Sequence, residues 1–166
     1  SPFEPDPAKI KIGDIAHHLS NICRYSGACE KFYSVAQHSC YVSYNCDPEH
    51  ALRGLLHDAS EAYLNDVAAP LKHHPQFAFY RELETRVDQA ICAAFNLPFE
   101  MHPSIKVADE RIYHTETRDL FPSFETPLER YSENNKPYRS YIEPWTSQKA
   151  ENKFLDRYVF LRDRAR

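Results

Sequence analysis

The chain has 166 residues, a formal net charge of -4 and a hydrophobic content of 42%. These values fit a single globular domain over residues 1–166, because a chain of this size buries enough apolar surface to fold alone. Its longest apolar runs are only a few residues, so we expect neither a signal peptide nor a membrane partner, and we expect a cytoplasmic protein. Basic residues are scattered along the chain, which argues against duplex nucleic acid as a partner.

The cysteines and glycines exclude several common sites. None of the five cysteines forms a C-x-x-C pair, which favours reduced core thiols over a zinc knuckle or a disulfide framework. None of the three glycines belongs to a G-x-G-x-x-G or G-x-x-x-x-G-K pattern, so the usual backbone cradles for dinucleotides and triphosphates are missing. If phosphate binds here, a metal ion and cationic side chains must hold it.

Helical periodicity dominates the chain after a short, irregular, proline-rich N-terminal segment, so the predicted fold is all-α. Asp14 is the expected N-cap of a first helix that ends near Ile22. Ser34 and Gln37 have the spacing of a capping box for a second helix, which runs to about Asn45. The apolar spacing predicts further helices over about 47–56, 60–64, 76–95, 103–120 and 146–164.

Two connections interrupt this pattern. The Ala69-Pro70 step ends the short helix at 60–64, because the residue before a proline disfavours the α conformation. Residues 121–144 mix Pro, Ser, Asn and Tyr without a period and are expected to form a long loop. The predicted domain is therefore a compact helical bundle with a core over about 12–120, that loop, and a C-terminal helix over 146–164.

Two adjacent residues that commonly bind metals, His57 and Asp58, follow an apolar run at the end of the predicted helix over 47–56. Neighbours on a helix diverge by about 100°, so both side chains reach one ion only where the helix ends or bends. A solvated His-Asp pair at a helix end is the alternative for so short a motif.

Two further polar residues, His38 and Asp109, lie on the apolar stripes of their predicted helices. A hydrogen-bonded core histidine, and a salt bridge from Asp109 to Arg111 or Arg118, would each explain one of them. Together with the His-Asp pair they make two imidazoles and two carboxylates from three helices. That mixed N/O set suits a divalent ion with positions left for water and phosphate oxygen, whereas structural zinc would favour cysteines and a closed shell.

The order of these four residues, H...HD...D, resembles the motif of the HD-domain metal-dependent phosphohydrolases. The surrounding segments look like the small bacterial and bacteriophage 5'-deoxynucleotidases of that superfamily. These segments are Ala36-Gln37-His38-Ser39, Leu56-His57-Asp58-Ala59-Ser60-Glu61-Ala62, Asp66-x-x-x-Pro70-Leu71-Lys72 and Ala108-Asp109. The resemblance implies an HD-type helical bundle and one divalent metal ion (Mn, Co, Zn, Ni or Fe, with Mg as an alternative) on His38, His57, Asp58 and Asp109.

The same resemblance assigns roles to four further residues. Glu61 would position or deprotonate the attacking water, with an exposed helix glutamate as the alternative, and Asp66 would contact the sugar or assist proton transfer. Arg24 matches an arginine that contacts the substrate phosphate. Tyr25 stands where these nucleotidases often have a tryptophan against the sugar, and its ring could pack against deoxyribose. Because a transferred phosphoryl group carries negative charge, Lys72 is a second candidate cation.

Other polar residues near these motifs have simpler interpretations. His17 and His18 precede Arg24 and are expected to be surface or core histidines. Glu116 lies two turns after Asp109 on the same helix face. It could support a metal ligand, although an ion pair with Arg118 is the simpler account.

The expected activity is metal-dependent release of phosphate from a small-molecule nucleotide, a 2'-deoxyribonucleoside 5'-monophosphate. One alternative is a dNTP triphosphohydrolase, such as a dATPase releasing triphosphate, for which Arg130, Lys136 and Arg139 could supply further cations. The other alternative is a non-catalytic nucleotide-binding protein on an HD scaffold. The helices over 76–95 and 146–163 could present apolar faces to a second copy, so a homo-oligomer is a further expectation.

Overall fold

The computed structural model describes residues 1–121 and 135–164. In these ranges the chain is helical without β-strands, and an isolated bridge joins Cys23 to Ser34. The α-helices are, in chain order, α1 (Ile12–Asn21), α2 (Val35–Asn45), α3 (Ala51–Leu55), α4 (Glu61–Leu64), α5 (Ala69–Lys72), α6 (Ala78–Ala94), α7 (Pro103–Leu120) and α8 (Ser147–Arg164). Short 3-10 segments stand between them: η1 (Pro7–Lys9), η2 (Arg24–Gly27), η3 (Pro48–His50) and η4 (Pro75–Phe77). The all-α prediction is confirmed.

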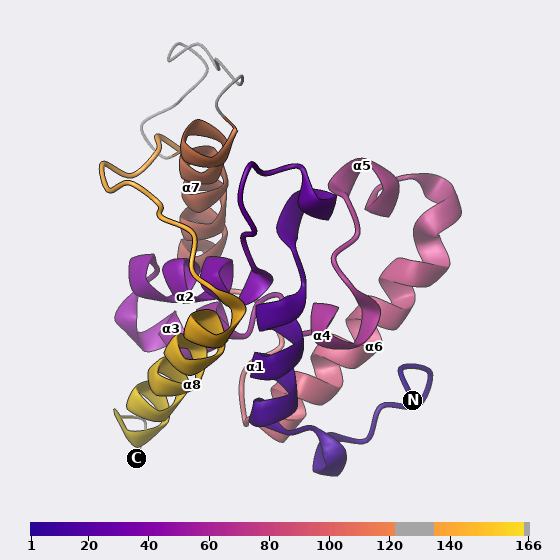
Figure 1. The fold of residues 1–166 in the computed structure, drawn as a ribbon. Helices are drawn as coiled ribbons and strands as arrows, with labels where there is room; N and C mark the ends of the chain where they lie inside the picture. The colour runs from indigo at the N-terminus through magenta and orange to yellow at the C-terminus, as the bar shows by residue number, and fades with distance from the viewer. Residues whose placement is uncertain (122–134, 165–166) are drawn as a thin grey trace.

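The helices pack around α1 and α2 (Figure 1). α1 lies beside α8 and also contacts α2 and α4, while α2 contacts α3, α7 and α8. α6 lies on the side of the bundle away from α8 and contacts α4 and α5. In Figure 1 the segment after α1 rises between α7 on one side and α5 on the other. This arrangement brings residues from the first and last thirds of the chain to one end of the bundle.

One continuous hydrophobic core joins these helices. Its buried members include Ile15, Leu19, Val35, Val42, Leu55, Ile91, Ile105, Ile112 and Phe154. Burying one such side chain is worth about 1.5–3 kcal/mol, so packing rather than intrinsic helix propensity holds the helices together. Helices α2 and α7, which carry predicted metal ligands, are therefore anchored on the same core.

The first two helices test the capping predictions. The Asp14 cap is wrong: α1 begins at Ile12 after Lys11, and Asp14 lies in the first turn, where its negative charge favours the helix dipole. Ser34 is the N-cap of α2 as predicted, and its hydroxyl accepts a hydrogen bond from the backbone N–H of Gln37 at 3.2 Å. The Gln37 side chain completes no capping box. It donates to the Glu143 carbonyl at 2.8 Å and ties down the segment before α8.

The predicted helix over 47–56 divides into η3 and α3. Gly54 allows the close approach of α3 to α2, because a Cβ there would lie 2.8 Å from the sulfur of Cys46. The helical bonds end at Leu56, and Arg53 donates to the Leu56 carbonyl at 3.2 Å. The residues that follow, His57 and Asp58, are therefore at a helix end, which is the position from which both side chains can reach one ion.

The two predicted connections differ from expectation in detail. α4 ends at Leu64, before Ala69-Pro70, but that step also begins the four-residue helix α5, with the proline in its first turn. Of the predicted loop over 121–144, residues 122–134, including Arg130, lie outside the described residues. The described part is non-helical and bonds to α7: the N–H of Tyr138 donates to Thr115 Oγ1 at 2.9 Å.

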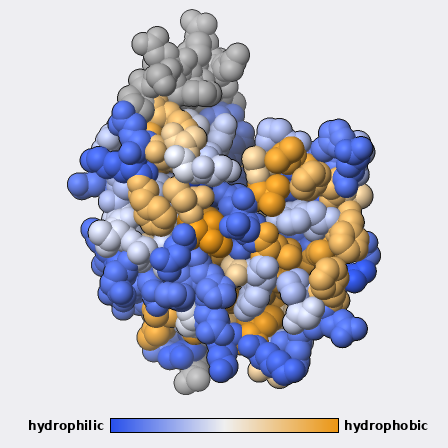
Figure 2. All heavy atoms as spheres, turned by 45° about the vertical axis from the view of Figure 1, so that its right-hand side comes forward, coloured by the Kyte–Doolittle hydropathy of each residue, from blue (hydrophilic) through white to orange (hydrophobic). Residues whose placement is uncertain are grey.

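Hydrophobic and hydrophilic side chains are interspersed on the face shown in Figure 2. Exposed large side chains include Tyr44, Phe79 and Phe160. They lie on α2, α6 and α8, so the expected homo-oligomer stays a prediction. Among the described helices, none is both long enough and apolar enough to span a membrane.

Candidate metal centre and the cavity above it

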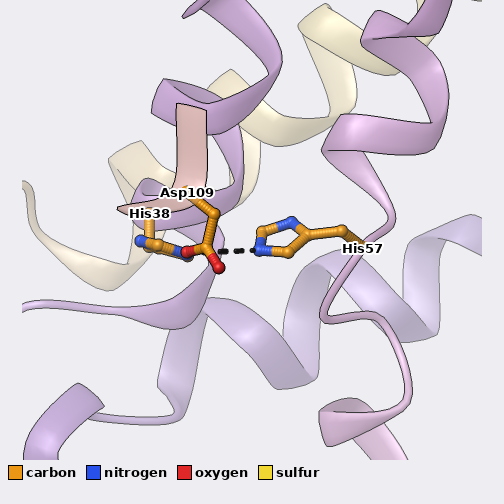
Figure 3. A group of neighbouring side chains, drawn as sticks. All are labelled: His38, His57 and Asp109. Carbon is orange, nitrogen blue, oxygen red and sulfur yellow. Dashed lines mark hydrogen bonds and ion pairs between the residues drawn. The ribbon is translucent and has the colours of Figure 1, made fainter. Parts of the chain in front are cut away.

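Three predicted ligands from three parts of the chain meet at one point (Figure 3). His38 comes from α2, His57 from the turn after α3, and Asp109 from α7; one ligand atom from each lies within 4.8 Å of the others. The Nε2 atoms of the two histidines are 3.3 Å apart. Asp109 Oδ1 lies 3.1 Å from His38 Nε2 and 3.9 Å from His57 Nε2. These residues could hold a metal ion.

The fourth predicted ligand, Asp58, lies beside this group. Its Oδ2 is 3.2 Å from Nε2 of His57 and 3.5 Å from Nε2 of His38. The proximity of adjacent residues depends on the helix end at Leu56, because on a continuing helix their side chains would diverge. Asp58 and His57 therefore face the same small volume.

The two kinds of ligand differ in burial. His38 is fully buried and His57 almost so, whereas the Asp58 and Asp109 side chains are 24% and 45% exposed. The sequence placed Asp109 on the apolar stripe of its helix, but its side chain is about half exposed while its oxygen approaches His38. The imidazoles are therefore the buried part of the group, and the carboxylates are the part nearer to solvent.

Hydrogen bonds fix both imidazoles in the orientation that metal binding requires. Nδ1 of His57 donates to the Gly54 carbonyl at 2.8 Å, and Nδ1 of His38 donates to Glu116 Oε1 at 2.7 Å. In the neutral rings the lone pairs are then on the two Nε2 atoms, which point at each other. Two such lone pairs at 3.3 Å repel unless a cation or a proton lies between them. The donor set fits a divalent ion with nitrogen and oxygen ligands.

Glu116 is the hub that the sequence identified only in part. It is fully buried; Oε1 accepts hydrogen bonds from His38 and from the Tyr33 hydroxyl at 2.8 Å. Oε2 accepts from Arg24 Nη2 at 3.1 Å and from the Tyr25 hydroxyl. Burial raises the pKa of Glu116, but Arg24 and His38 lower it more, to about 2, so this carboxylate is ionised at neutral pH.

The simpler account of Glu116, an ion pair with Arg118, is therefore wrong. Arg118 instead donates to Asp119 at 2.6 Å and to backbone carbonyls of the segment before α8, including that of Tyr138. Of the proposed partners of Asp109, Arg118 is engaged there and Arg111 donates to the carbonyl of Lys136 at 2.9 Å. Glu116 and Asp109 each contact His38 instead.

A cavity of about 620 Å³ lies beside this group of residues and is bordered by Asp58 and Asp109. Six of the nine residues predicted for the site line it: Arg24, Tyr25, Asp58, Asp66, Lys72 and Asp109. The other three, His38, His57 and Glu61, are buried residues that do not line it. The volume is within the range of small-molecule sites, which is about 300–1,000 Å³.

Arg24 and Tyr25 enter this cavity from η2, a segment of unusual backbone conformation. Tyr25 and Ser26 have φ values of 56° and 53°, in the left-handed region that costs side-chain-bearing residues about 1–3 kcal/mol each. Gly27, at φ 82°, meets no such penalty. The Tyr25–Glu116 hydrogen bond and a 2.9 Å bond from Arg24 N to Tyr33 O hold the segment. Strain of this kind is typical of functional sites.

The remaining predicted catalytic residues lie at the α4–α5 side. Glu61 is 4% exposed, so its alternative interpretation as an exposed glutamate is wrong. Its Oε1 lies 3.9 Å from Nζ of Lys72, which donates more closely to Glu84 at 2.7 Å. Burial, with the negative charges of Asp58 and Asp66, raises the pKa of Glu61 well above its usual value. His17 and His18 are exposed, as expected.

Two aromatic residues of the cavity were not predicted as site residues. Tyr113 lines it from α7, and Phe121 lines it from the position just after that helix. Tyr113 follows Asp109 by four residues, which places the two on neighbouring positions of the helix surface, and this spacing was the available signal. The aromatic residues of a helix are usually core residues, which is why the signal is weak without a structure.

Comparisons with known proteins do not name an activity. No family model matches the chain. The chain is 44% identical over 111 residues to the uncharacterized protein YfdR of Escherichia coli, covering 67% of this chain and 61% of that protein. It is 36% identical over 115 residues to an uncharacterized protein of Rhodobacter capsulatus, covering 64% of this chain and 58% of the relative. The chain thus spans about three fifths of the length of each relative.

Proposed function

We propose that this chain is a divalent-metal-dependent phosphohydrolase of the HD-domain type that converts deoxynucleoside 5'-monophosphates to deoxynucleosides and phosphate. The observation that carries the proposal is the pair of Nε2 atoms 3.3 Å apart, each on a ring whose Nδ1 is already bonded. Such a pair suits a bound cation better than a packed core. With the oxygens of Asp58 and Asp109, it favours Mn, Co, Zn, Ni or Fe, with Mg as the harder alternative.

The bound ion would supply an activated water and a Lewis acid for the phosphoryl oxygen. The chain's own residues would do the rest. Arg24 presents Nη1 at 3.7 Å from Asp58 Oδ2 and borders the cavity, which supports a role for its guanidinium in binding a phosphate beside the metal ligands. Glu61 has a raised pKa, which suits a group that accepts a proton near neutral pH. Asp66 borders the cavity and could contact sugar or assist that proton transfer.

Charge favours a monophosphate over a triphosphate. The described lining residues include two permanent cations, Arg24 and Lys72, and four carboxylates: Asp58, Asp66, Asp109 and Glu110. Both cations are already paired, with Glu116 and Glu84. A divalent ion would bring the net charge of these six side chains to zero. A neutral site suits a phosphate dianion but leaves little positive charge for three phosphates.

The loop cations do not change this balance within the described residues. Lys136 and Arg139 do not line the cavity there, and Arg130 lies outside the described residues. We therefore keep the triphosphohydrolase as the alternative that the assay must exclude.

The test is product analysis with metal-stripped protein resupplied separately with manganese, cobalt, zinc or magnesium. Each deoxynucleoside mono- and triphosphate is incubated and the products are separated by chromatography. Metal-dependent orthophosphate from monophosphates supports the proposal. Release of intact triphosphate would establish the triphosphohydrolase instead, and absence of turnover with any metal would favour the non-catalytic nucleotide-binding protein.

A further inference from the structure

We propose that Tyr113, with Tyr25 and Phe121, forms an aromatic platform that binds the nucleobase by stacking, and that the cavity accepts purines in preference to pyrimidines. This inference rests on the proposed function for its phosphate end. The platform itself lies at the other end of the cavity, where the lining includes the aromatic rings of Tyr25, Tyr113 and Phe121.

α7 sets the distance between the two ends. Asp109, Tyr113 and Thr117 of α7 line the cavity, and so does Phe121, the residue that follows the helix. With a rise of about 1.5 Å per residue, Tyr113 stands about 6 Å along the helix axis from Asp109. A phosphate beside Asp109 would thus place its base, one sugar ring away, at Tyr113.

Tyr25 completes the platform from the other wall. Its ring centroid lies 6.4 Å from that of Tyr113 and 5.1 Å from that of Phe121, against which it packs edge to face. The Tyr25 hydroxyl is bonded to Glu116, which prevents the ring from turning away. Tyr113 is 42% exposed, so among the three rings of the platform it has surface free for a ligand.

Few side chains at this end could read the edge of a base. The Thr117 hydroxyl donates to the carbonyl of His114 in its own helix at 3.0 Å. Ser26 is exposed at the turn of η2, and Glu110 is already bonded to Asn135 at 3.1 Å. Within the described lining, recognition by stacking therefore outweighs recognition by hydrogen bonds. Stacking tolerates any base and grows with ring area, so a purine binds better.

The experiment compares a nucleotide with the same sugar phosphate lacking its base. We would measure kcat/KM for dAMP, dCMP and 2-deoxyribose 5-phosphate with the wild type, Tyr113→Ala and Tyr113→Phe. Tyr113→Ala should lower kcat/KM for dAMP about tenfold, change that for the sugar phosphate less than twofold, and reduce the preference for dAMP over dCMP. Tyr113→Phe should retain wild-type values. Tyr141→Ala is the matched control, because Tyr141 is 71% exposed outside the cavity.

Binding of deoxyadenosine, measured by calorimetry with and without metal, separates the two proposals. About tenfold weaker binding to Tyr113→Ala would support the platform even if no phosphate were released. Phosphate release that is unchanged in Tyr113→Ala for every substrate would overturn the platform while leaving the phosphohydrolase intact. Equal losses of kcat/KM for dAMP and for the sugar phosphate would also overturn the platform. So would an affinity for deoxyadenosine that Tyr113→Ala does not change.

Discussion

Replacing Glu116 by glutamine is the sharpest test of the metal centre, because it changes one atom at the hub. The amide oxygen can still accept from Nδ1 of His38, but the amide nitrogen then faces two donors, Arg24 Nη2 and the Tyr25 hydroxyl. If the amide turns round, its N–H₂ faces Nδ1 of His38 and forces the ring proton onto Nε2, the predicted ligand atom. Either orientation weakens metal binding.

The expected magnitudes follow from these contacts. Losing a bonded outer partner of a metal ligand typically costs 10–100-fold in metal affinity, or about 1.4–2.7 kcal/mol. Removing the closer of the two carboxylates beside the buried guanidinium of Arg24 costs at most about 3–5 kcal/mol of folding free energy, because Asp58 remains at 3.7 Å. A domain of this size is stable by about 5–15 kcal/mol, so the variant should remain folded when assayed cold.

The assay is a competition titration of zinc or cobalt against a chromogenic chelator, with circular dichroism to confirm folding. Glu82→Gln is the matched control, because Glu82 is an exposed residue of α6 whose recorded ion pair is with Arg86 on the surface. The control should keep wild-type metal affinity. A folded Glu116→Gln protein that binds metal within twofold of the wild type would refute the reasoning.

Three further outcomes are expected. Asp58→Ala should abolish turnover and reduce bound metal, measured by phosphate release and elemental analysis. Full activity of this variant would refute the proposed site. Arg24→Ala should chiefly raise the KM for the nucleotide while metal is retained, and a loss of metal equal to that in Asp58→Ala would contradict its role at the phosphate. Burial and Arg24 lower the pKa of His38, but Glu116 and Asp109 raise it more, to about 10 in the metal-free protein. Metal must then displace a proton, so metal affinity should rise about tenfold per pH unit between pH 6.5 and 8, and calorimetry in buffers of different ionisation enthalpy should detect proton release. A metal affinity that does not depend on pH would argue against this proton. Because the pKa of His38 is raised in the folded state, protonated His38 stabilises the metal-free protein fully below about pH 6.5, and this contribution is lost as the pH rises towards 10.

The sequence was sufficient for the elements whose signals are local. Pro103 to Leu120 carries a helical period after a proline, and α7 has these bounds. Ser34 was recognisable as an N-cap because a cap bonds its own next turn. The apolar run before His57 predicted a helix that ends near Leu56, and α3 ends there. Helix caps, apolar periodicity and helix ends depend on neighbours within about four residues, so they can be predicted from the sequence.

Only the tertiary structure decided which polar groups meet. Glu116 and Arg24 are 92 residues apart, and no local pattern distinguished their pairing from one with Arg118. The left-handed turn at Tyr25 depends on packing, because a residue with a side chain disfavours that conformation. A metal centre needs atoms placed to within a few tenths of an ångström, and that precision comes from the shared core of α2, α3 and α7. Residue type and spacing identify the candidate ligands, whereas the packing of distant helices brings them together beside a cavity.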